Sequence, residues 1–193
     1  MLLYKYMEES KEQILIKRLH LKEETAWKEL FEAYSGNLTY VCSRYIIGQE
    51  DVHDVLQNSF IKMFRSIDSF EYRGNGSLRP WITRIVVTES LKYLKQNPDF
   101  KLVEDEFEIP DVPEEEPDLQ EISQTTIMKM IRTLPDGYRT VFNLFVFEEK
   151  SHKEIAGILG IAENSSASQF HRAKAMLGHK IKEYKMSKTA QYE

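Results

Sequence analysis

Apolar residues recur every three or four positions along most of the chain, which is the spacing of amphipathic helices. In the first half this spacing predicts helices at residues 8–19, 23–34, 38–47, 50–67 and 79–96. Gly36 is expected to bend the chain between the second and third of these helices, and Gly48 to end the third. In the second half the spacing predicts helical segments at residues 119–133, 135–147 and 151–184, with a frayed tail at residues 186–193. The pattern therefore indicates an all-α fold.

The segment at residues 151–182 has the organisation of two helices joined by a tight turn. Ser151 and Glu154 have the spacing of a capping box, in which each side chain accepts a hydrogen bond from the backbone amide of the other residue. Gly160 can adopt the left-handed conformation that ends a helix. The next helix has three candidate caps, Asn164, Ser165 and Ser166, and the last of these also starts a capping-box spacing.

The second helix of this pair is predicted to bury one stripe of side chains, formed by Ser166, Phe170, Ala173, Leu177, Ile181 and Tyr184. Its other faces carry hydrogen-bonding and cationic groups, with no carboxylate between Glu163 and Glu183. A helix in the DNA major groove needs such groups, because Lys and Arg neutralise phosphates while Gln, Ser and His bond base edges. The sequence therefore predicts a DNA-binding helix-turn-helix, with an ordinary helical hairpin as the alternative.

The predicted helix at residues 50–67 has two distinct sides. One is a continuous apolar stripe expected in the core, formed by Val52, Val55, Leu56, Ser59, Phe60, Met63, Phe64 and Ile67. The other brings four residues together at i, i+3, i+4 and i+7, namely Asp54, Gln57, Asn58 and Ile61. This side is either solvated surface or a partner site. In the helix at residues 23–34, Trp27 and Phe31 are expected to pack in the core.

Two glycines, aromatic residues and an arginine interrupt the helical pattern at residues 69–78. The helix that follows is expected to turn five residues inward, Trp81, Ile85, Thr88, Leu91 and Leu94. It also carries cationic side chains near aromatic rings, namely Arg79, Arg84, Lys92 and Lys95 near Tyr72, Trp81 and Tyr93. This mixture suits single-stranded DNA, because bases stack on rings while Lys and Arg meet the backbone. The alternative is a basic surface helix packed by its own aromatic residues.

Charge is unevenly distributed along the chain. The net charge is −5, which is unfavourable for a DNA-binding protein. Residues 99–121 hold eleven acidic residues and one basic residue, whereas the rest of the chain holds 20 acidic and 25 basic residues. Residues 99–118, which include Pro110, Pro113 and Pro117, are therefore predicted to form an acidic, extended linker. This linker would separate a first domain at residues 1–98 from a second at residues 119–193.

Nothing in the composition indicates catalytic or metal chemistry, so neither a cofactor nor a metal is expected. Cys42 is the only cysteine and lies in an apolar run, so it is expected to be a buried structural thiol. No nucleophile, metal-ligand or phosphate-binding motif is recognised. His152 and His171 are expected at the surface, and only His171 is expected to contact DNA. With no apolar run long enough to span a membrane and no signal peptide, the protein is expected in the cytoplasm, without membrane insertion.

Two blocks of the sequence resemble conserved regions of bacterial RNA polymerase sigma factors. The second region of that family is similar to residues 51–70, DVHDVLQNSFIKMFRSIDSF, together with the glycine-containing break and RPWITRIVVTESLKYLK. The fourth region is similar to LPDGYRTVFNLFVFEEKSHKEIAGILGIAENSSASQFHRAKAML. A short acidic linker separates the two blocks and no third region is seen, which resembles the extracytoplasmic-function (ECF) group of the sigma-70 family. The resemblance covers roughly residues 23–184.

The resemblance implies a role for each predicted face. Core RNA polymerase, through the clamp helices of its largest subunit, would be bound by Asp54, Gln57, Asn58 and Ile61. The downstream promoter element, on a non-template strand that opens with one base flipped into the break, would be read by Tyr72, Arg73, Asn75, Arg79, Trp81, Arg84, Lys92 and Lys95. The major groove of the upstream element would receive Ser165, Ala167, Ser168, Gln169, His171, Arg172 and Lys174. The linker would run through the polymerase toward the RNA exit channel, and an anti-sigma factor is a further partner that the resemblance allows.

Four positions depart from the family pattern. Asn58 stands where an acid usually follows the glutamine, which puts the strength of the polymerase contact in doubt. Thr88 replaces a common asparagine, and Asn164 replaces a glycine in the turn, a modest change because asparagine tolerates left-handed backbone angles. Ala167 stands where a lysine is common, which removes a phosphate or base contact. These departures do not overturn the assignment.

We therefore predict an all-helical, two-domain sigma factor that directs core polymerase to a set of promoters by binding and strand opening, without covalent chemistry. One alternative is a helix-turn-helix regulator that binds duplex DNA through its second domain and senses or dimerises through its first. The other is an enzyme, which the lack of a recognisable nucleophile, metal or phosphate motif disfavours.

Overall fold

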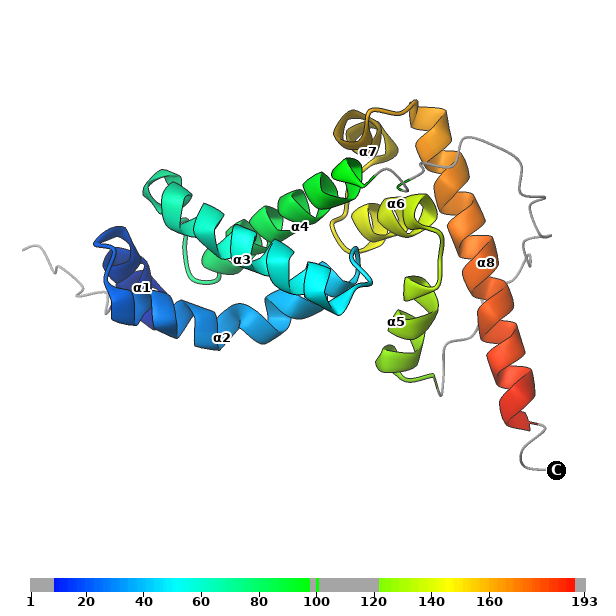
Figure 1. The fold of residues 1–193 in the computed structure, drawn as a ribbon, viewed down its shortest axis with the longest axis horizontal. Helices are drawn as coiled ribbons and strands as arrows, with labels where there is room; N and C mark the ends of the chain where they lie inside the picture. Colours follow the sequence, from blue (N-terminus) through cyan, green and yellow to red (C-terminus); the bar gives the residue numbers. More distant parts are fainter. Residues whose placement is uncertain (1–8, 98–99, 101–121, 190–193) are drawn as a thin grey trace, which may run out of the picture. The chain divides into compact units, whose positions relative to one another are not determined.

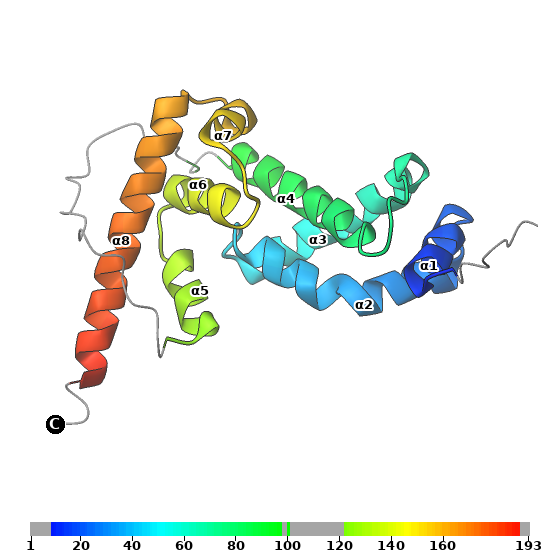
Figure 2. The ribbon, with the colours of Figure 1, turned by 180° about the vertical axis from the view of Figure 1, so that it is seen from behind.

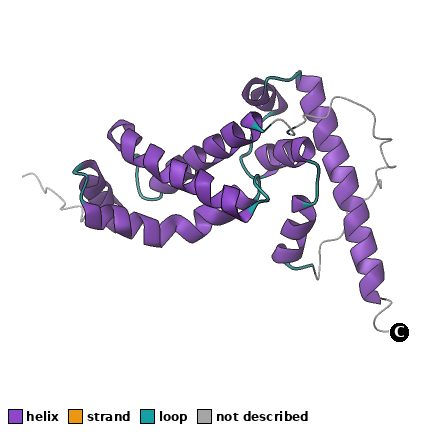
Figure 3. Ribbon diagram, in the orientation of Figure 1, coloured by secondary structure: helices purple, strands orange, loops and turns teal. Residues whose placement is uncertain are grey.

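The computed structural model describes residues 9–97, 100 and 122–189 (Figure 1). These residues form eight α-helices and one 3₁₀ turn, with no strand among them (Figure 3). The predicted all-α fold class is therefore confirmed. The chain divides into two compact units, Met1–Leu94 and Lys95–Glu193. Apart from Phe100, the predicted linker at residues 99–118 lies outside the described residues, so the domain and linker bounds stay predictions.

The first unit is built from α1 (Lys11–His20), α2 (Glu24–Ser43), α3 (Gln49–Ser66), the 3₁₀ turn η1 (Ile67–Ser69) and most of α4 (Leu78–Gln96). Helices α2 and α3 pack side by side, and α1 packs against α2 and η1 (Figures 1 and 2). Their shared core consists of fully buried apolar side chains, among them Leu19, Leu30, Leu38, Met63, Ile82 and Val86. Cys42 belongs to this core as predicted, and its burial raises the pKa of the thiol.

Helix α2 runs without interruption through Gly36, so the predicted bend there is wrong. A glycine inside a helix costs only about 1 kcal/mol relative to alanine. The core residues Leu30 and Leu38 flank Gly36 and hold both halves of α2 on one packing surface. Tertiary packing therefore outweighs the local cost. Gly48 was expected to end a helix, but α2 already ends at Ser43. Gly48 is instead the N-cap of the next helix, α3.

The inward face of α4 differs from the predicted one. Leu91 and Leu94 are buried as expected, but Thr88 is exposed and Trp81 and Ile85 are only half-buried. The positions that face the core are instead Leu78, Ile82, Val86, Val87, Ser90, Leu91 and Leu94. Apolar residues occur on more than one side of this helix, so the spacing fits two stripes and packing selects between them.

Two aromatic residues of α2 lie at the edge of the core and not within it. Trp27 is half-buried and its ring centroid lies 5.1 Å from that of Phe64. Phe31 is 53% exposed and pairs with Phe60 at the same centroid separation, 5.1 Å. The prediction that Phe31 is a core residue is therefore wrong, and Phe64, expected in the buried stripe, is exposed.

The second unit contains α5 (Gln124–Arg132), α6 (Asp136–Val146), α7 (His152–Leu159) and α8 (Glu163–Thr189). Helix α8 lies against α5, α6 and α7 (Figures 1 and 2). One core cluster joins α5, α6 and α8 through Met128, Ile131, Leu134, Tyr138, Ala173 and Leu177. The long α8 is therefore the helix against which the other three helices of this unit pack.

Both ends of α8 differ from the predicted ones. The helix begins at Glu163, so all three candidate caps, Asn164, Ser165 and Ser166, are inside the helix and none of them caps it. The amide of Ser166 donates to the carbonyl of Ala162 at 3.1 Å. At the other end the helix continues to Thr189, so the predicted frayed tail from residue 186 is wrong up to that point. Residues 190–193 lie outside the described part of the chain.

Helices long and apolar enough to cross a membrane do not occur among the described residues. The same part of the chain holds no group of His, Cys, Asp and Glu side chains suited to a metal ion.

Candidate nucleic-acid and partner interfaces

The helix-turn-helix begins with the predicted capping box. The Ser151 hydroxyl accepts from the amide of Glu154 at 3.3 Å, and the Glu154 carboxylate accepts from the amide of Ser151 at 2.9 Å. These bonds from Ser151, with a further one from Lys150, hold the pKa of the Glu154 carboxyl below its ordinary value. Gly160 ends α7 with φ of 76°, the left-handed conformation predicted for it.

Replacing Ser151 with alanine is expected to cost about 1 kcal/mol of the free energy of unfolding, because an N-cap bond is lost. The lowered pKa of Glu154 means that its contribution is present above the ordinary glutamate pKa of about 4.3 and is lost as the pH falls through the lowered value. The difference in free energy of unfolding between the wild type and Ser151→Ala, measured with denaturant, should therefore be smaller at about pH 3 than at about pH 7. Ser168→Ala, at an exposed serine of α8, is the control, and an equal loss in both variants would contradict the cap.

His152 connects α6, α7 and α8, although it was expected to face solvent. Its Nδ1 lies 3.0 Å from the hydroxyl of Ser166, and its ring stacks on Phe145 at 4.7 Å between centroids. Phe145 in turn contacts Phe170 at 4.2 Å. The expectation that His152 is a surface residue is therefore wrong. These contacts fix the start of α8 against α6 and α7.

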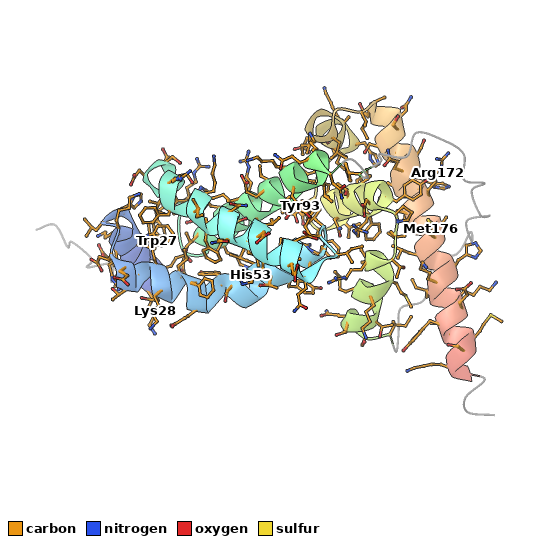
Figure 4. The ribbon with its side chains drawn as sticks, in the orientation of Figure 1. Trp27, Lys28, His53, Tyr93, Arg172 and Met176 are labelled. Carbon is orange, nitrogen blue, oxygen red and sulfur yellow. The ribbon has the colours of Figure 1, made fainter. Side chains whose placement is uncertain are left out.

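The first turns of α8 present only part of the predicted DNA-contacting set. The exposed members are Ser165, Ala167, Ser168, His171 and Lys174. Gln169 is only 3% exposed, so the expectation that it lies on the exposed face of this helix is wrong. Arg172, labelled on α8 in Figure 4, is half-buried. Its Nη1 donates to the hydroxyl of Tyr138 at 3.5 Å. The exposed face is thus hydroxylic and cationic.

A second candidate surface comprises the 70–77 loop (residues 70–77) and α4. Gly74 and Gly76 have φ of 114° and 90°, values that side chains rarely allow, which explains the two glycines of this break. Arg73 and Asn75 are exposed in the loop, and Tyr72 is half-buried. Glu12 of α1 accepts hydrogen bonds from the amides of Gly76 and Leu78, a contact 64 and 66 residues apart in sequence that no local pattern could reveal.

The cationic and aromatic side chains of this surface differ in their exposure to solvent. The cations are all exposed, namely Arg79, Arg84, Lys92 and Lys95. Trp81 is half-buried and packs on Phe70 at 5.0 Å between ring centroids. Tyr93 reaches from α4 toward α3 (Figure 4), where its hydrogen bond to Asp51, together with burial, raises the pKa of Tyr93 to about 12. The rings are therefore partly engaged by the protein itself.

The third candidate surface is the polar side of α3. Asp54, Gln57, Asn58 and Ile61 are all exposed, and Ile61 retains 43% of its accessible surface. The predicted grouping on one open face is therefore confirmed. Phe31 and Phe64 add exposed aromatic surface on α2 and α3, which the sequence had assigned to the core.

Two sigma-factor family models match these two units. The model described as Sigma-70 region 2 matches residues 30–98, and the one described as Sigma-70, region 4, matches residues 124–177. ECF RNA polymerase sigma-E factor of Haemophilus influenzae is 29% identical over 187 residues, covering 90% of this chain and 97% of that protein. Proteins of the same description from Salmonella typhimurium LT2 and Escherichia coli K12 are 29% and 28% identical, each covering 90% of this chain and 96% of the relative.

A solved structure, described as CnrH in complex with the cytosolic domain of CnrY, overlaps with a TM-score of 0.48 and 20% identity. The overlap covers 88% of this chain and 96% of the chain in that structure.

The two matches in this order, with relatives along 90% of the chain, define the class: the chain belongs to the sigma-70 family of RNA polymerase sigma factors. Within that family it is a member of the ECF group, as the sequence predicted.

Proposed function

We propose that this sigma factor binds core RNA polymerase through α3, reads and opens the downstream promoter element through the 70–77 loop and α4, and reads the upstream element through α8. The observation that carries the proposal is the open α3 face, where all four predicted residues are exposed within the region 2 match. The match of this helix to Sigma-70 region 2 favours this proposal over a DNA-binding regulator that is not a polymerase subunit.

The α3 face has the composition of a protein-binding surface. Ile61 provides an apolar centre, while Asp54, Gln57 and Asn58 provide hydrogen-bonding groups around it. Asn58 gives this face one fewer negative charge than the family pattern has. The contact is therefore proposed to depend on Asp54 and Gln57 for its polar part.

The 70–77 loop and α4 are suited to single-stranded DNA. Arg79, Arg84, Lys92 and Lys95 expose four cations for the phosphate backbone, while Arg73 and Asn75 expose hydrogen-bonding groups on the loop. Trp81 is proposed to act through one ring edge or face only, because Phe70 covers part of it. Binding the non-template strand at this surface would stabilise the open promoter, so strand separation requires no covalent step.

The proposed duplex-reading set on α8 is smaller than the sequence predicted. Ser165, Ala167, Ser168, His171 and Lys174 are retained, Arg172 contributes from a half-buried position, and Gln169 is withdrawn. The anchoring of the start of α8 by His152 supports this role, because base reading requires a fixed helix position. The acidic linker, the cytoplasmic location and the anti-sigma partner remain proposals from the family.

Lys174→Ala is expected to weaken binding to upstream-element duplexes by a similar factor for all sequences. It should lower the slope of log affinity against log salt by about 0.9 unit, the value for one lost phosphate contact. Fluorescence anisotropy of the holoenzyme across a salt series measures this slope. Lys182→Ala, another exposed lysine of α8, is the matched control, and an equal change in both slopes would contradict a specific contact of Lys174.

Run-off transcription tests the proposed function directly. Sigma-free core polymerase, a mixed promoter library and the purified protein should give discrete transcripts, and their start sites would define its promoters. If there is no transcript and no co-elution with core where another sigma factor works, the proposal fails. Duplex DNA binding that persists in that case would support the regulator.

A further inference from the structure

The first turn of α1 is bonded to the 70–77 loop at two places. The Glu12 carboxylate accepts from the amide of Gly76 at 2.7 Å through Oε2 and from the amide of Leu78 at 2.9 Å through Oε1. The hydroxyl of Ser10, the N-cap of α1, lies 3.1 Å from the phenol oxygen of Tyr72. Both arms of the loop are therefore attached to one helical turn that lies far away in sequence.

The Glu12 contact has the chemistry of a strong anchor. Leu78 is the first residue of α4, so its amide has no partner within the helix, and a carboxylate there is favoured by the helix dipole. Bonds from neutral amides to an ionised carboxylate are shorter and stronger than neutral ones. Glu12 thus caps α4 from a different element.

The start of the loop is fixed by Phe70, which is buried and packs on Trp81, but the glycine-containing end has few contacts besides those with Glu12. The internal backbone hydrogen bonds of the loop run from the amide of Ser77 to the carbonyl of Gly74, at 3.1 Å, and from the amide of Arg73 to the Ser77 hydroxyl, at 3.3 Å. A further bond, from Nη2 of Arg73 to the Glu71 carboxylate at 3.5 Å, joins two exposed side chains. Gly74 and Gly76 both have positive φ, and glycine backbones lose the most conformational freedom when ordered. Removing Glu12 would therefore release a loop that can adopt several conformations.

The anchored conformation leaves the outer edge of the loop exposed to solvent. Arg73 and Asn75 are exposed, whereas Gly76 and Leu78 direct their amides toward Glu12. Glu12 lies outside the region 2 match, which begins at residue 30. We propose that Glu12 is a positioning residue that holds the 70–77 loop in the conformation that reads the downstream element, so that α1 takes part in promoter selectivity.

This inference rests on the proposed function, because it requires the loop to read DNA. It predicts a change in discrimination between bases and not a uniform loss of binding. A loop free to adopt several conformations would still meet the strand, but it would accept different bases more equally. A purely structural role of Glu12 would instead weaken binding to every probe by the same factor.

The test uses the holoenzyme and fork-junction probes that carry the downstream element of a promoter found by run-off transcription. Each single-stranded position is changed to the other three bases, and relative affinities are measured. Glu12→Ala is expected to reduce the discrimination at the loop-contacted position by about tenfold, the effect of losing charge-assisted bonds. Glu12→Gln, which keeps one oxygen acceptor, should restore part of it. Glu32→Ala, an exposed glutamate of α2, is the matched control and should change nothing.

Hydrogen exchange of the free protein provides a readout that does not depend on polymerase. In Glu12→Ala the amide protection of Gly76 and Leu78 should fall by at least about tenfold while that of α3 is retained. Unchanged protection, unchanged discrimination, or a uniform loss across all probes would each overturn the inference while the proposed function stands. Failure of the wild-type protein to bind core polymerase would instead refute the proposed function, and the inference with it.

Discussion

Changing Asp54 and Gln57 together to alanine is expected to abolish promoter-specific transcription while leaving the protein folded. Both side chains are exposed on α3, and alanine is the best helix former, so the stability should change by less than about 0.5 kcal/mol. At a protein interface, truncating a hot-spot residue near the centre costs more than about 1 kcal/mol, and the proposal makes Asp54 and Gln57 two such residues. Affinity for core polymerase should therefore fall by at least about thirtyfold.

The measurement combines run-off transcription with co-elution of core polymerase. A matched control replaces Lys28 and Glu32, an exposed ion pair at 3.9 Å on α2, by alanine. Lys28 projects from the side of α2 opposite α3 (Figure 4), so this variant should behave as the wild type. Duplex binding to the upstream element by the Asp54→Ala, Gln57→Ala variant should be unchanged. Full transcription by that variant would refute the α3 face as the polymerase contact.

Replacing Arg139 with alanine is expected to destabilise the second unit by about 3 kcal/mol, because it removes a buried ion pair and two hydrogen bonds to carbonyl oxygens. Arg139 is only 2% exposed, and its Nη1 donates to the carbonyls of Leu134 at 2.8 Å and Arg132 at 3.4 Å. Its Nη2 bonds the carboxylate of Asp136. Burial lowers the pKa of the guanidinium and Asp136 opposes this, so the side chain stays charged. It therefore ties the end of α5 to the start of α6.

The two tryptophans allow this effect to be assigned to one unit. Trp27 and Trp81 both lie in the first unit, so their fluorescence reports its unfolding, whereas far-UV circular dichroism reports both units. Arg139→Ala should shift only the circular-dichroism transition to lower denaturant. Lys129→Ala, at an exposed lysine of α5, is the control and should shift neither. An equal shift of the tryptophan transition would contradict a role confined to the second unit.

Three features that depend on near neighbours in sequence were predicted correctly, although the local predictions of a bend at Gly36 and a cap at Ser166 were not. The Ser151–Glu154 capping box needs two residues three positions apart, and the left-handed end at Gly160 needs one residue without a side chain. The open α3 face follows from i, i+3, i+4 and i+7 spacing on one helix. The two linear blocks that resemble sigma regions 2 and 4 likewise indicated the sigma-70 family from the sequence.

Features that depend on which neighbour covers a helix were predicted poorly. Spacing defines the sides of a helix relative to its own axis, but a helix with apolar residues on several sides, such as α4, has more than one candidate inward face. Thr88 was therefore assigned to the core although Ile82 and Val86 occupy it. In α8, polar Gln169 was expected outside, yet it is enclosed near the packed stripe.

The sequence by itself determined the helical class, the Ser151–Glu154 capping box, the polar face of α3 and the family, because each is encoded by residues within one or two helical turns or by a linear motif. The tertiary structure alone decided that His152 bonds Ser166, that Gln169 is buried, and that Glu12 holds the 70–77 loop. These contacts join residues of different elements, 14 residues apart for His152 and 64 or more for Glu12. They form only when packing brings those elements together, and the local spacing of residues in the sequence does not specify which elements pack together.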